Sequence, residues 1–244
     1  QILIHELDEL RWQDVGNHLN HYVKLNPQEK IVSAMVIDLF DEKREIVTVS
    51  REGMIKRSML SDFELKRTGQ LSMAMNLDKK DELVTAHLRD SIDKEVLLLS
   101  HEGYALRFSL DEVNVVGTRA KGVIGMRVDE KDYVVDMTLI NDQKDDFVFV
   151  SDRNELKRVK KDQVNIQNRA TKGQRIARYV KSNPHTLQAV YLMHLDETMM
   201  FYKDEHMQLC KAVDVPIMKL DATFSNVLDD QSIKLVLRRD MNML

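Results

Sequence analysis

The 244-residue sequence contains a single cysteine, Cys210, and no apolar run that approaches the ~20 residues needed to span a membrane. One cysteine excludes an internal disulfide framework and a cysteine-based zinc site. No signal-peptide pattern opens the chain, so we expect a reducing, cytoplasmic setting and no membrane partner. Because the first residue is Gln1 rather than methionine, we expect a fragment of a longer protein.

The sequence also lacks the motifs of common enzymes. It contains no nucleophile–base arrangement, phosphate-binding loop or nucleotide fingerprint, so we expect neither catalysis nor a cofactor. His18 and His21 have helical spacing, but no carboxylate or third ligand accompanies them, and we expect no metal site. The net charge of −4 does not by itself indicate a nucleic-acid partner.

What the sequence does contain is a repeat. Similar segments recur at intervals of 50, 51 and 52 residues: EIVTVSREGMIKR at 45–57, EVLLLSHEGYALR at 95–107, DFVFVSDRNELKR at 146–158 and TMMFYKDEHMQLC at 198–210. Their alternation and central turns predict β-hairpins. The turn positions hold residue types that tolerate a positive φ angle, namely Gly53, Gly103, Asn154 and His206.

Further β-rich runs accompany the hairpins. One precedes each hairpin, at 30–37, 82–89, 133–140 and 187–194, and another follows a longer loop, at 71–77, 123–129 and 175–181. Four strands in about fifty residues is the size of a propeller blade, in which radial packing protects the sheet edges. A β-solenoid is the alternative, although its repeats are usually shorter. The sequence therefore predicts an all-β, propeller-like fold with repeats at about 29–80, 81–131, 132–185 and 186–229.

The two ends of the chain read as half-units. Residues 2–10 align with the later half of a unit, and residues 229–240 align with the beginning of one. Half-units at about 1–28 and 230–244 can complete one blade, close the ring and bring the termini together. We therefore expect one domain of about five four-stranded blades.

Positive charge gathers in the loops before the last strand of each unit, as in FELKRTGQL at 63–71, VVGTRAKGV at 115–123 and IQNRATKGQ at 166–174. Residues 152–178 contain nine basic and three acidic side chains, whereas 129–146 contain seven acids and two lysines. Such segregation is typical of a directional binding surface. Lys and Arg neutralise phosphates without reading bases, and we expect the loop glycines to let the backbone approach the sugar-phosphate chain.

The hairpins and Arg-x-(x)-Lys-Gly loops, together with WQDVGNHLNHYVKL at 12–25, resemble the C-terminal domain of the A subunit of bacterial type IIA topoisomerases. The resemblance implies a β-pinwheel whose blades exchange strands and whose basic outer rim bends double-stranded DNA. It also implies two protein partners: the N-terminal cleavage core of the same subunit, which carries the catalytic tyrosine, and the ATPase subunit of the holoenzyme. A bacterial, nucleoid-associated location follows from the same resemblance.

One stretch separates the branches of this family. Residues 64–70, ELKRTGQ, keep a basic pair and one glycine of the gyrase marker Gln-Arg-Arg-Gly-Gly-Lys-Gly, but not the motif. This departure favours topoisomerase IV, in which the domain would present DNA segments for decatenation and relaxation. The alternatives are a gyrase wrapping domain and a protein-interaction β-propeller, although the Trp-Asp and double-Gly signatures of common propellers are missing.

A lone Lys-Arg pair on a hairpin is more often a solvated face than a DNA contact, but recurrence in several units favours a role. We expect the third repeat, which has the densest positive charge, to contribute most. The candidate DNA-binding residues are the basic side chains of the hairpins and loops: Lys56, Arg57, Lys66, Arg67, Arg107, Arg119, Lys121, Lys157, Arg158, Lys160, Arg169, Lys172, Arg175 and Arg178.

Overall fold

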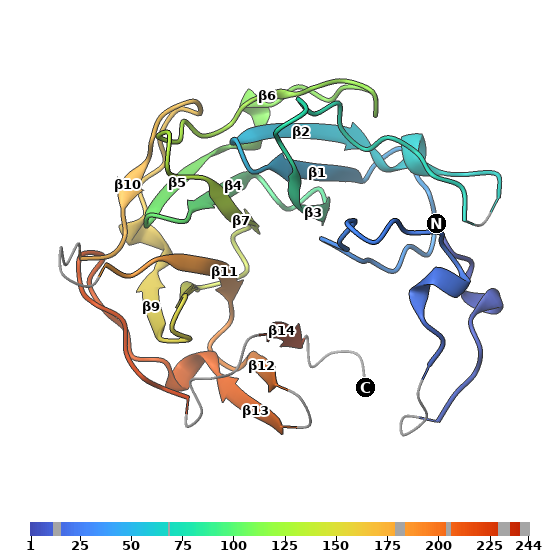
Figure 1. The fold of residues 1–244 in the computed structure, drawn as a ribbon. Helices are drawn as coiled ribbons and strands as arrows, with labels where there is room; N and C mark the ends of the chain where they lie inside the picture. Colours follow the sequence, from blue (N-terminus) through green and yellow to red (C-terminus); the bar gives the residue numbers. More distant parts are fainter. Residues whose placement is uncertain (12–15, 68, 179–183, 204–205, 229–234, 240–244) are drawn as a thin grey trace.

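The computed structural model describes residues 1–11, 16–67, 69–178, 184–203, 206–228 and 235–239. In this part of the chain, antiparallel strands form four sheets arranged around a common centre (Figure 1). The all-β, propeller-like fold predicted from the repeats is confirmed. Six short 3-10 turns within the same residues are η1 (Ile4–Glu6), η2 (Leu19–His21), η3 (Leu60–Phe63), η4 (Leu110–Glu112), η5 (Lys161–Gln163) and η6 (Ala212–Asp214).

Each sheet is built on one of the repeated hairpins. In sheet 1 the strand order is β3 (Leu83–Arg89), β1 (Glu45–Ser50), β2 (Met54–Met59) and β6 (Val123–Ile124). In sheet 2 it is β10 (Gln174–Arg175), β5 (Tyr104–Ser109), β4 (Glu95–Ser100) and β7 (Val134–Ile140). Sheet 3 contains β11 (Leu187–Met193), β8 (Asp146–Ser151) and β9 (Leu156–Lys160), and sheet 4 contains β13 (His206–Lys211), β12 (Thr198–Lys203) and β14 (Leu235–Arg239).

The turn residues explain why the hairpins form where they do. Gly53, Gly103 and Asn154 have φ angles of 84°, 89° and 57°, as predicted from their types. The prediction is wrong for His206, which is the first residue of β13 and pairs with Lys203. The two residues between β12 and β13, 204–205, lie outside the described residues.

The inner strand of each sheet comes from the beginning of the next predicted repeat. Strand β3 pairs with β1, β7 with β4 and β11 with β8, so the blades do not follow the predicted repeat boundaries. The run at 30–37, predicted to be a strand, forms none. Within the described residues before it there is no hairpin strand with which it could pair.

The same rule corrects the predicted closing blade. Strand β14, from the C-terminal half-unit, pairs with β12 and completes sheet 4, so this half-unit does not share a blade with residues 1–28. The chain that precedes β1 lies against sheet 1, where the Ser33 hydroxyl donates to the carbonyl of Ala86 (2.7 Å). The predicted adjacency of the termini stays a prediction, because residues 240–244 lie outside the described part of the chain.

The outer strands are exchanged between units. Strand β6 follows the second hairpin in sequence but pairs with β2, and β10 follows the third hairpin but pairs with β5. In sheet 3, Ser225 makes the corresponding bridge to Leu156. The strand exchange implied by the family resemblance is thus present. The run at 71–77 forms no strand, although its Met75 is buried against the Thr48 hydroxyl.

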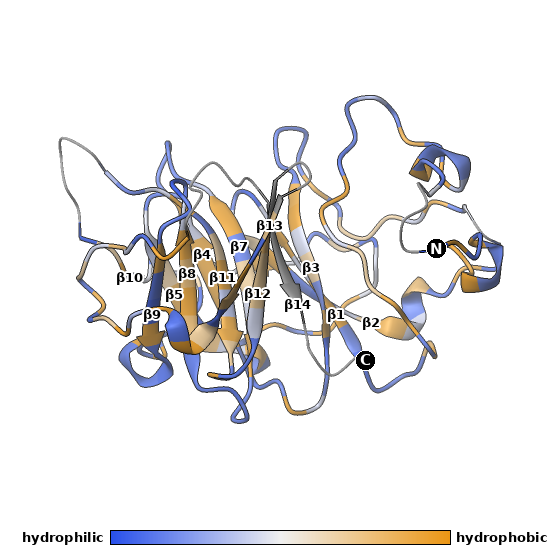
Figure 2. Ribbon diagram, turned by 90° about the horizontal axis from the view of Figure 1, so that it is seen from below, coloured by the Kyte–Doolittle hydropathy of each residue, from blue (hydrophilic) through white to orange (hydrophobic). Residues whose placement is uncertain are grey.

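The hydrophobic core lies between consecutive sheets, which bury the central strands on both faces. In β4, Val96 and Leu98 pack toward sheet 1, whereas Leu97 and Leu99 pack toward sheet 3. Sheets 3 and 4 share a third cluster of buried side chains. Figure 2 shows hydrophobic residues concentrated along these strands and hydrophilic residues in the loops. Burial on both faces explains why EVLLLS is a continuous apolar run rather than an alternating one.

A buried arginine joins each sheet to the next. Arg107 on β5 pairs with Glu95 on β4 (Nε–Oε2, 2.6 Å), and its Nη1 donates to the carbonyls of Lys161 (2.9 Å) and Val164 (3.0 Å) beside η5. Arg57 does the same with Glu45 and the carbonyls of Leu110 and Val113, and Arg158 does so with Asp146 and Val215. Each arginine therefore fixes one sheet against the turn that opens the next outer loop.

The fourth hairpin lacks both the acid and the arginine, which agrees with a role of this pair in joining one sheet to the next. Thr198 and Cys210 stand where the other hairpins have an acid and an arginine, and no further sheet follows in the described residues. The acid and the arginine are thus present together or absent together. Since an unpaired buried charge is costly, neither partner is expected to be retained without the other.

We expect Arg107→Cys to reduce the free energy of unfolding by about 3–5 kcal/mol, because it leaves the Glu95 carboxylate half-buried without its partner. The double variant Glu95→Thr/Arg107→Cys, which copies the fourth hairpin, should lose less than the single variant. Urea denaturation at pH 7 measures both. A loss below 1 kcal/mol for the single variant, or a larger loss for the double, would contradict the role of this pair.

Candidate nucleic-acid interface

The structure divides the fourteen predicted DNA-binding residues into buried and exposed groups. The five cations of the hairpins face the interior, so their predicted role in contacting DNA is corrected. Lys56 and Lys157 are fully buried, Arg57 is 8% exposed, and the side chains of Arg107 and Arg158 are each 11% exposed. These hairpins are covered on both faces, and for this reason a Lys-Arg pair within β2 or β9 is internal.

Five of the remaining cations are free to meet a ligand. These side chains are exposed and make no hydrogen bond or ion pair with the described part of the chain: Lys66, Arg67, Arg119, Lys160 and Arg178. Arg119 precedes β6, and Arg178 follows β10. Because β6 and β10 are the outermost strands of their sheets (Figure 1), these two arginines are carried by the outer rim.

The two lysines of the Lys-Gly loops make equivalent ion pairs on the surface. Lys121 pairs with Asp78 (2.5 Å), and Lys172 pairs with Asp129. In each pair the aspartate belongs to the repeat that precedes the lysine's own repeat in sequence. The hydrogen bond to the carboxylate raises the pKa of both lysines, so both stay charged. Exposed pairs of this kind are worth little, and a phosphate can replace the carboxylate.

An aromatic side chain that the sequence analysis did not select lies beside the Lys172 loop. Lys172 Nζ lies 4.1 Å from the centre of the Tyr104 ring, and the Arg175 guanidinium lies 4.5 Å from it. Arg175 also donates to the Tyr104 hydroxyl (2.8 Å). Tyr104 thus orders two cations on the rim through cation–π contacts. The signal for it in the sequence is an aromatic residue directly after the turn glycine of the second hairpin.

Arg169 has a structural role, which differs from the predicted one. It is half-buried, its Nε donates to the carbonyl of Glu112, and its Nη1 donates to the carbonyl of Ile124 (both 3.0 Å). Its backbone N–H donates to the Glu112 carboxylate. The side chain therefore holds the 166–174 loop against the preceding unit, and a substitution here would change the loop itself.

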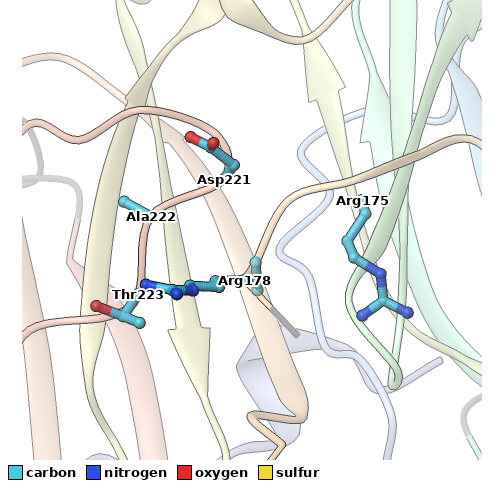
Figure 3. Close-up of a pocket in the computed structure, with 6 residues that line it drawn as sticks. Arg175, Arg178, Asp221, Ala222 and Thr223 are labelled. Carbon is cyan, nitrogen blue, oxygen red and sulfur yellow. The ribbon is translucent and has the colours of Figure 1, made fainter. Parts of the chain in front are cut away.

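A cavity of about 570 Å³ opens on the rim between the 175–178 and 221–223 segments. It is lined by Arg175, Ala177, Arg178, Asp221, Ala222 and Thr223. Figure 3 shows Arg178 extending toward Thr223, with Arg175 on the opposite side. Two guanidinium groups and a hydroxyl donor can bind a phosphodiester oxygen, since charge-assisted hydrogen bonds of this kind are strong. Asp221 is the one acid among these residues.

The loop glycines approach protein backbone rather than a ligand, which corrects their predicted function. A Cβ atom on Gly173 would lie 2.4 Å from the carbonyl oxygen of Ala105, and one on Gly122 would lie 2.4 Å from that of Ile55. Both glycines have positive φ angles, 80° and 87°. The Lys-Gly sequence is therefore required for laying an exchanged strand on the preceding hairpin.

We expect Gly173→Ala to destabilise the fold by at least about 2 kcal/mol, because the new methyl group meets a carbonyl and the left-handed backbone disfavours alanine. Gly117→Ala is the matched control, since nothing lies within 4 Å of its Cβ position. The control should change the urea midpoint little. Equal losses in the two variants would show that the close approach is not important.

The inner strands surround a polar cavity, in which the Asp136 carboxylate accepts hydrogen bonds from backbone N–H groups. A cavity of about 260 Å³ is lined by inner-strand residues that include Thr85, Asp136, Gln188 and Tyr191. Asp136 accepts hydrogen bonds from the N–H groups of Met137 (2.8 Å) and Val190 (2.9 Å), which ties β7 to β11. Burial raises the pKa of Asp136 to about 7. The bond between Asp136 and Val190 could not be predicted from the sequence, because it links two inner strands that belong to different units.

The described residues contain neither a metal-binding cluster nor a membrane-spanning helix. No group of three or more His, Cys, Asp or Glu side chains among them could hold a metal ion. His18 instead caps η2 by accepting a hydrogen bond from the Asn20 N–H. No helix in the described residues is long and apolar enough to cross a membrane.

The architecture and the cationic rim define a strand-exchanged β-propeller with a candidate polyanion-binding edge. A family model described as "DNA gyrase C-terminal domain, beta-propeller" matches residues 1–38, 44–88, 94–141 and 145–191. The chain belongs to this family. The matched segments end with the inner strands, in agreement with the observed blades rather than with the predicted repeat boundaries.

Several relatives are similar in sequence. The A subunit of DNA topoisomerase 4 from Bacillus subtilis (strain 168) is 32% identical over 197 residues, covering 81% of this chain and 24% of the relative. The A subunit of DNA gyrase from Helicobacter pylori (strain ATCC 700392 / 26695) is 31% identical over 170 residues, covering 70% of this chain and 20% of the relative. The chain thus spans about a quarter of the length of the curated relatives that it matches.

Solved structures agree with this assignment. A crystal structure of the C-terminal domain of DNA topoisomerase IV superposes with a TM-score of 0.83 at 30% identity, covering 94% of this chain and 71% of that one. A DNA gyrase A C-terminal domain superposes with a TM-score of 0.75 at 20% identity, covering 87% of this chain and 70% of that one, which shows a shared fold. The structure at 30% identity is of the domain that the resemblance in the loops predicted.

Proposed function

We propose that this chain is the non-catalytic C-terminal domain of a topoisomerase IV A subunit, and that it binds and bends duplex DNA along its outer rim. The observation that carries the proposal is the set of exposed cations beside the exchanged strands that have no hydrogen-bond or ion-pair partner among the described residues. Arg119 and Arg178 lie next to β6 and β10, on the outermost edges of two consecutive sheets. Lys160 adds a third free charge at the end of β9.

This arrangement suits a bent polyanion. Bending a duplex smoothly by 40–90° costs roughly 1–6 kcal/mol, so contacts must be spread along an arc. Consecutive sheets around one centre provide such an arc, and each presents lysine or arginine at its outer edge. The rim groups described above are lysines and arginines, and their contacts to phosphates carry no sequence information. Binding should therefore depend strongly on salt and weakly on sequence.

The proposal extends to the longer protein by analogy with its relatives. The cleavage core of the same subunit, with the catalytic tyrosine, and the ATPase subunit of the holoenzyme would be the protein partners, and the location would be the bacterial nucleoid. The domain would present DNA segments to the core for decatenation and relaxation. The missing gyrase marker at 64–70 favours this over gyrase-type wrapping. A peptide-binding propeller is the alternative from another class.

We expect Arg119→Ala/Arg178→Ala to weaken binding to unrelated 40-base-pair duplexes by a similar factor for each sequence. Each lost phosphate contact should reduce the slope of log affinity against log salt by about 0.9. Fluorescence anisotropy titrations between 50 and 200 mM salt measure both quantities. Neither side chain contacts the described residues through a hydrogen bond or ion pair, so the fold should be unaffected.

The control is Lys80→Ala/Lys131→Ala, which removes the same charge. Both lysines are exposed, but they lie in turns that lead into the inner strands β3 and β7. This variant should retain the salt slope of the unmodified protein. If both double variants lost affinity equally, net charge rather than the rim would explain binding. If neither changed it, the rim would be a solvated surface.

Incubation with supercoiled plasmid and magnesium tests the absence of catalysis. We expect binding without strand cleavage, because no nucleophile–base pair was found in the sequence and the cleavage tyrosine of this family belongs to a separate core. Agarose electrophoresis after protein removal detects nicked or linear product. Nicking that increases with protein concentration would contradict the proposal, and a preference of a thousandfold for one duplex would contradict non-specific binding.

A further inference from the structure

Two fully buried lysines lie directly beneath the basic outer loops. We propose that Lys157, and Lys56 in the same way, are positioning residues that hold the outer loops in the conformation that binds DNA. The inference deepens the function proposed above and rests on it. It assigns to these lysines a role in DNA binding without contact to DNA, which differs from the role predicted from the sequence.

The Lys157 ammonium joins the two walls of the rim cavity. Its Nζ donates to the carbonyl of Ile176 (2.5 Å) on one side, and to those of Leu220 (2.5 Å) and Ala222 (2.9 Å) on the other. Ile176 lies between the cavity residues Arg175 and Ala177, and Ala222 lines the cavity itself (Figure 3). One buried charge therefore sets the separation between the arginine wall and the 221–223 wall.

Lys56 makes the equivalent connection in sheet 1. Its Nζ donates to the carbonyls of Ala74, Gly117 (3.3 Å) and Thr118 (2.7 Å), which again belong to two different outer loops. Thr118 directly precedes Arg119, one of the free cations of the rim. The lysine thus fixes the backbone from which that guanidinium extends.

Sheet 2 shows how the loops are joined when the lysine is missing. Leu106 occupies the equivalent hairpin position and is buried. There the Ala170 N–H donates to the Gly125 carbonyl (2.6 Å), which is equivalent to the Ala74 carbonyl that Lys56 bonds in sheet 1. A second direct bond, from the Arg127 N–H to the Thr171 carbonyl (2.9 Å), is shared with sheet 1, where the Asn76 N–H donates to the Ala120 carbonyl (3.1 Å). The hairpin therefore accepts leucine at this position. The two outer loops are then joined by a backbone N–H donor instead of the lysine ammonium.

The chemistry of the ammonium explains why lysine is suitable. It offers three donors and matches three carbonyl acceptors, whereas a neutral amine offers two. Burial lowers the pKa of Lys56 and of Lys157 to about 8, and the charges of Asp62 and Asp221, respectively, oppose this shift. The Phe224 ring lies 5.6 Å from Lys157 Nζ, with His185 and its partner Glu155 beyond it. One loop contact is consequently lost as each lysine is deprotonated.

Raising the pH should have opposite effects on stability and on DNA binding. The pKa of each lysine is lower in the folded state, so the unfolded chain binds more protons above pH 8 and the free energy of unfolding rises with pH. Measurements should stop at pH 9, because burial raises the pKa of the Cys210 thiol to about 11, which has the opposite effect. DNA affinity should fall over the same range, from pH 7 to 9.

The decisive variant is Lys157→Leu, which copies the residue that sheet 2 tolerates. We expect at least a fivefold loss of affinity for a 40-base-pair duplex at pH 7, a smaller salt slope, and a weaker decrease in affinity between pH 7 and 9 than in the unmodified protein. Lys56→Leu should act similarly through Arg119. Hydrogen exchange in 174–178 and 219–223 should become faster in Lys157→Leu.

The control for stability is Val148→Ala, a truncation in the core cluster between sheets 3 and 4, to which neither Lys157 nor a residue of the rim cavity belongs. It should lower the urea midpoint and leave affinity and salt slope unchanged. If the unmodified protein failed to bind duplex DNA, the proposed function itself would fail. If it bound and Lys157→Leu bound equally well with the same pH profile, only the positioning role would be overturned.

Discussion

The fold depends on a buried arginine that serves two sheets at once. Each of Arg57, Arg107 and Arg158 pairs with an acid of its own hairpin and donates to a carbonyl beside the next 3-10 turn. The guanidinium has five donors in a fixed plane, so these partners together set both distance and orientation. The apolar clusters between the sheets bury both faces of the central strands, and the arginines fix the sheet spacing across which these clusters pack.

Much of the fold could be predicted because its signals are local. The period, the hairpins and the turn glycines follow from residues close together in sequence, and Gly53 and Gly103 have the expected φ angles. Strand partners could not be predicted in this way. Spacing identifies 82–89 as a strand, but it does not say that the strand pairs with the hairpin before it. For the same reason, spacing does not show that β14, from the C-terminal half-unit, pairs with β12.

The site could be predicted only in part, since charge in a sequence carries no information about burial. Arg57 and Arg67 occur in similar Lys-Arg pairs, yet one is internal and the other is exposed. The sequence also contains no direct sign that the Lys-Gly glycines meet the carbonyls of Ile55 and Ala105. The net charge, as expected, does not indicate whether the protein has a nucleic-acid partner. A chain with net charge −4 can still have a cationic edge, because the charges are distributed unevenly over its surface. Some of the acids even support that edge, since Asp78 and Asp129 form ion pairs with the rim lysines Lys121 and Lys172.

Strand exchange imposes an order on biosynthesis. The outer strand of sheet 1, β6, is translated only after the second hairpin has been made, and that of sheet 2 only after the third. While the chain emerges from the ribosome, each new sheet therefore has an open outer edge that is covered one unit later. Since transiently unpaired edges promote aggregation, a chain that stops after a complete hairpin is more hazardous than its length suggests. Each of these two sheets is therefore completed one repeat later than its own hairpin, by the unit that follows it.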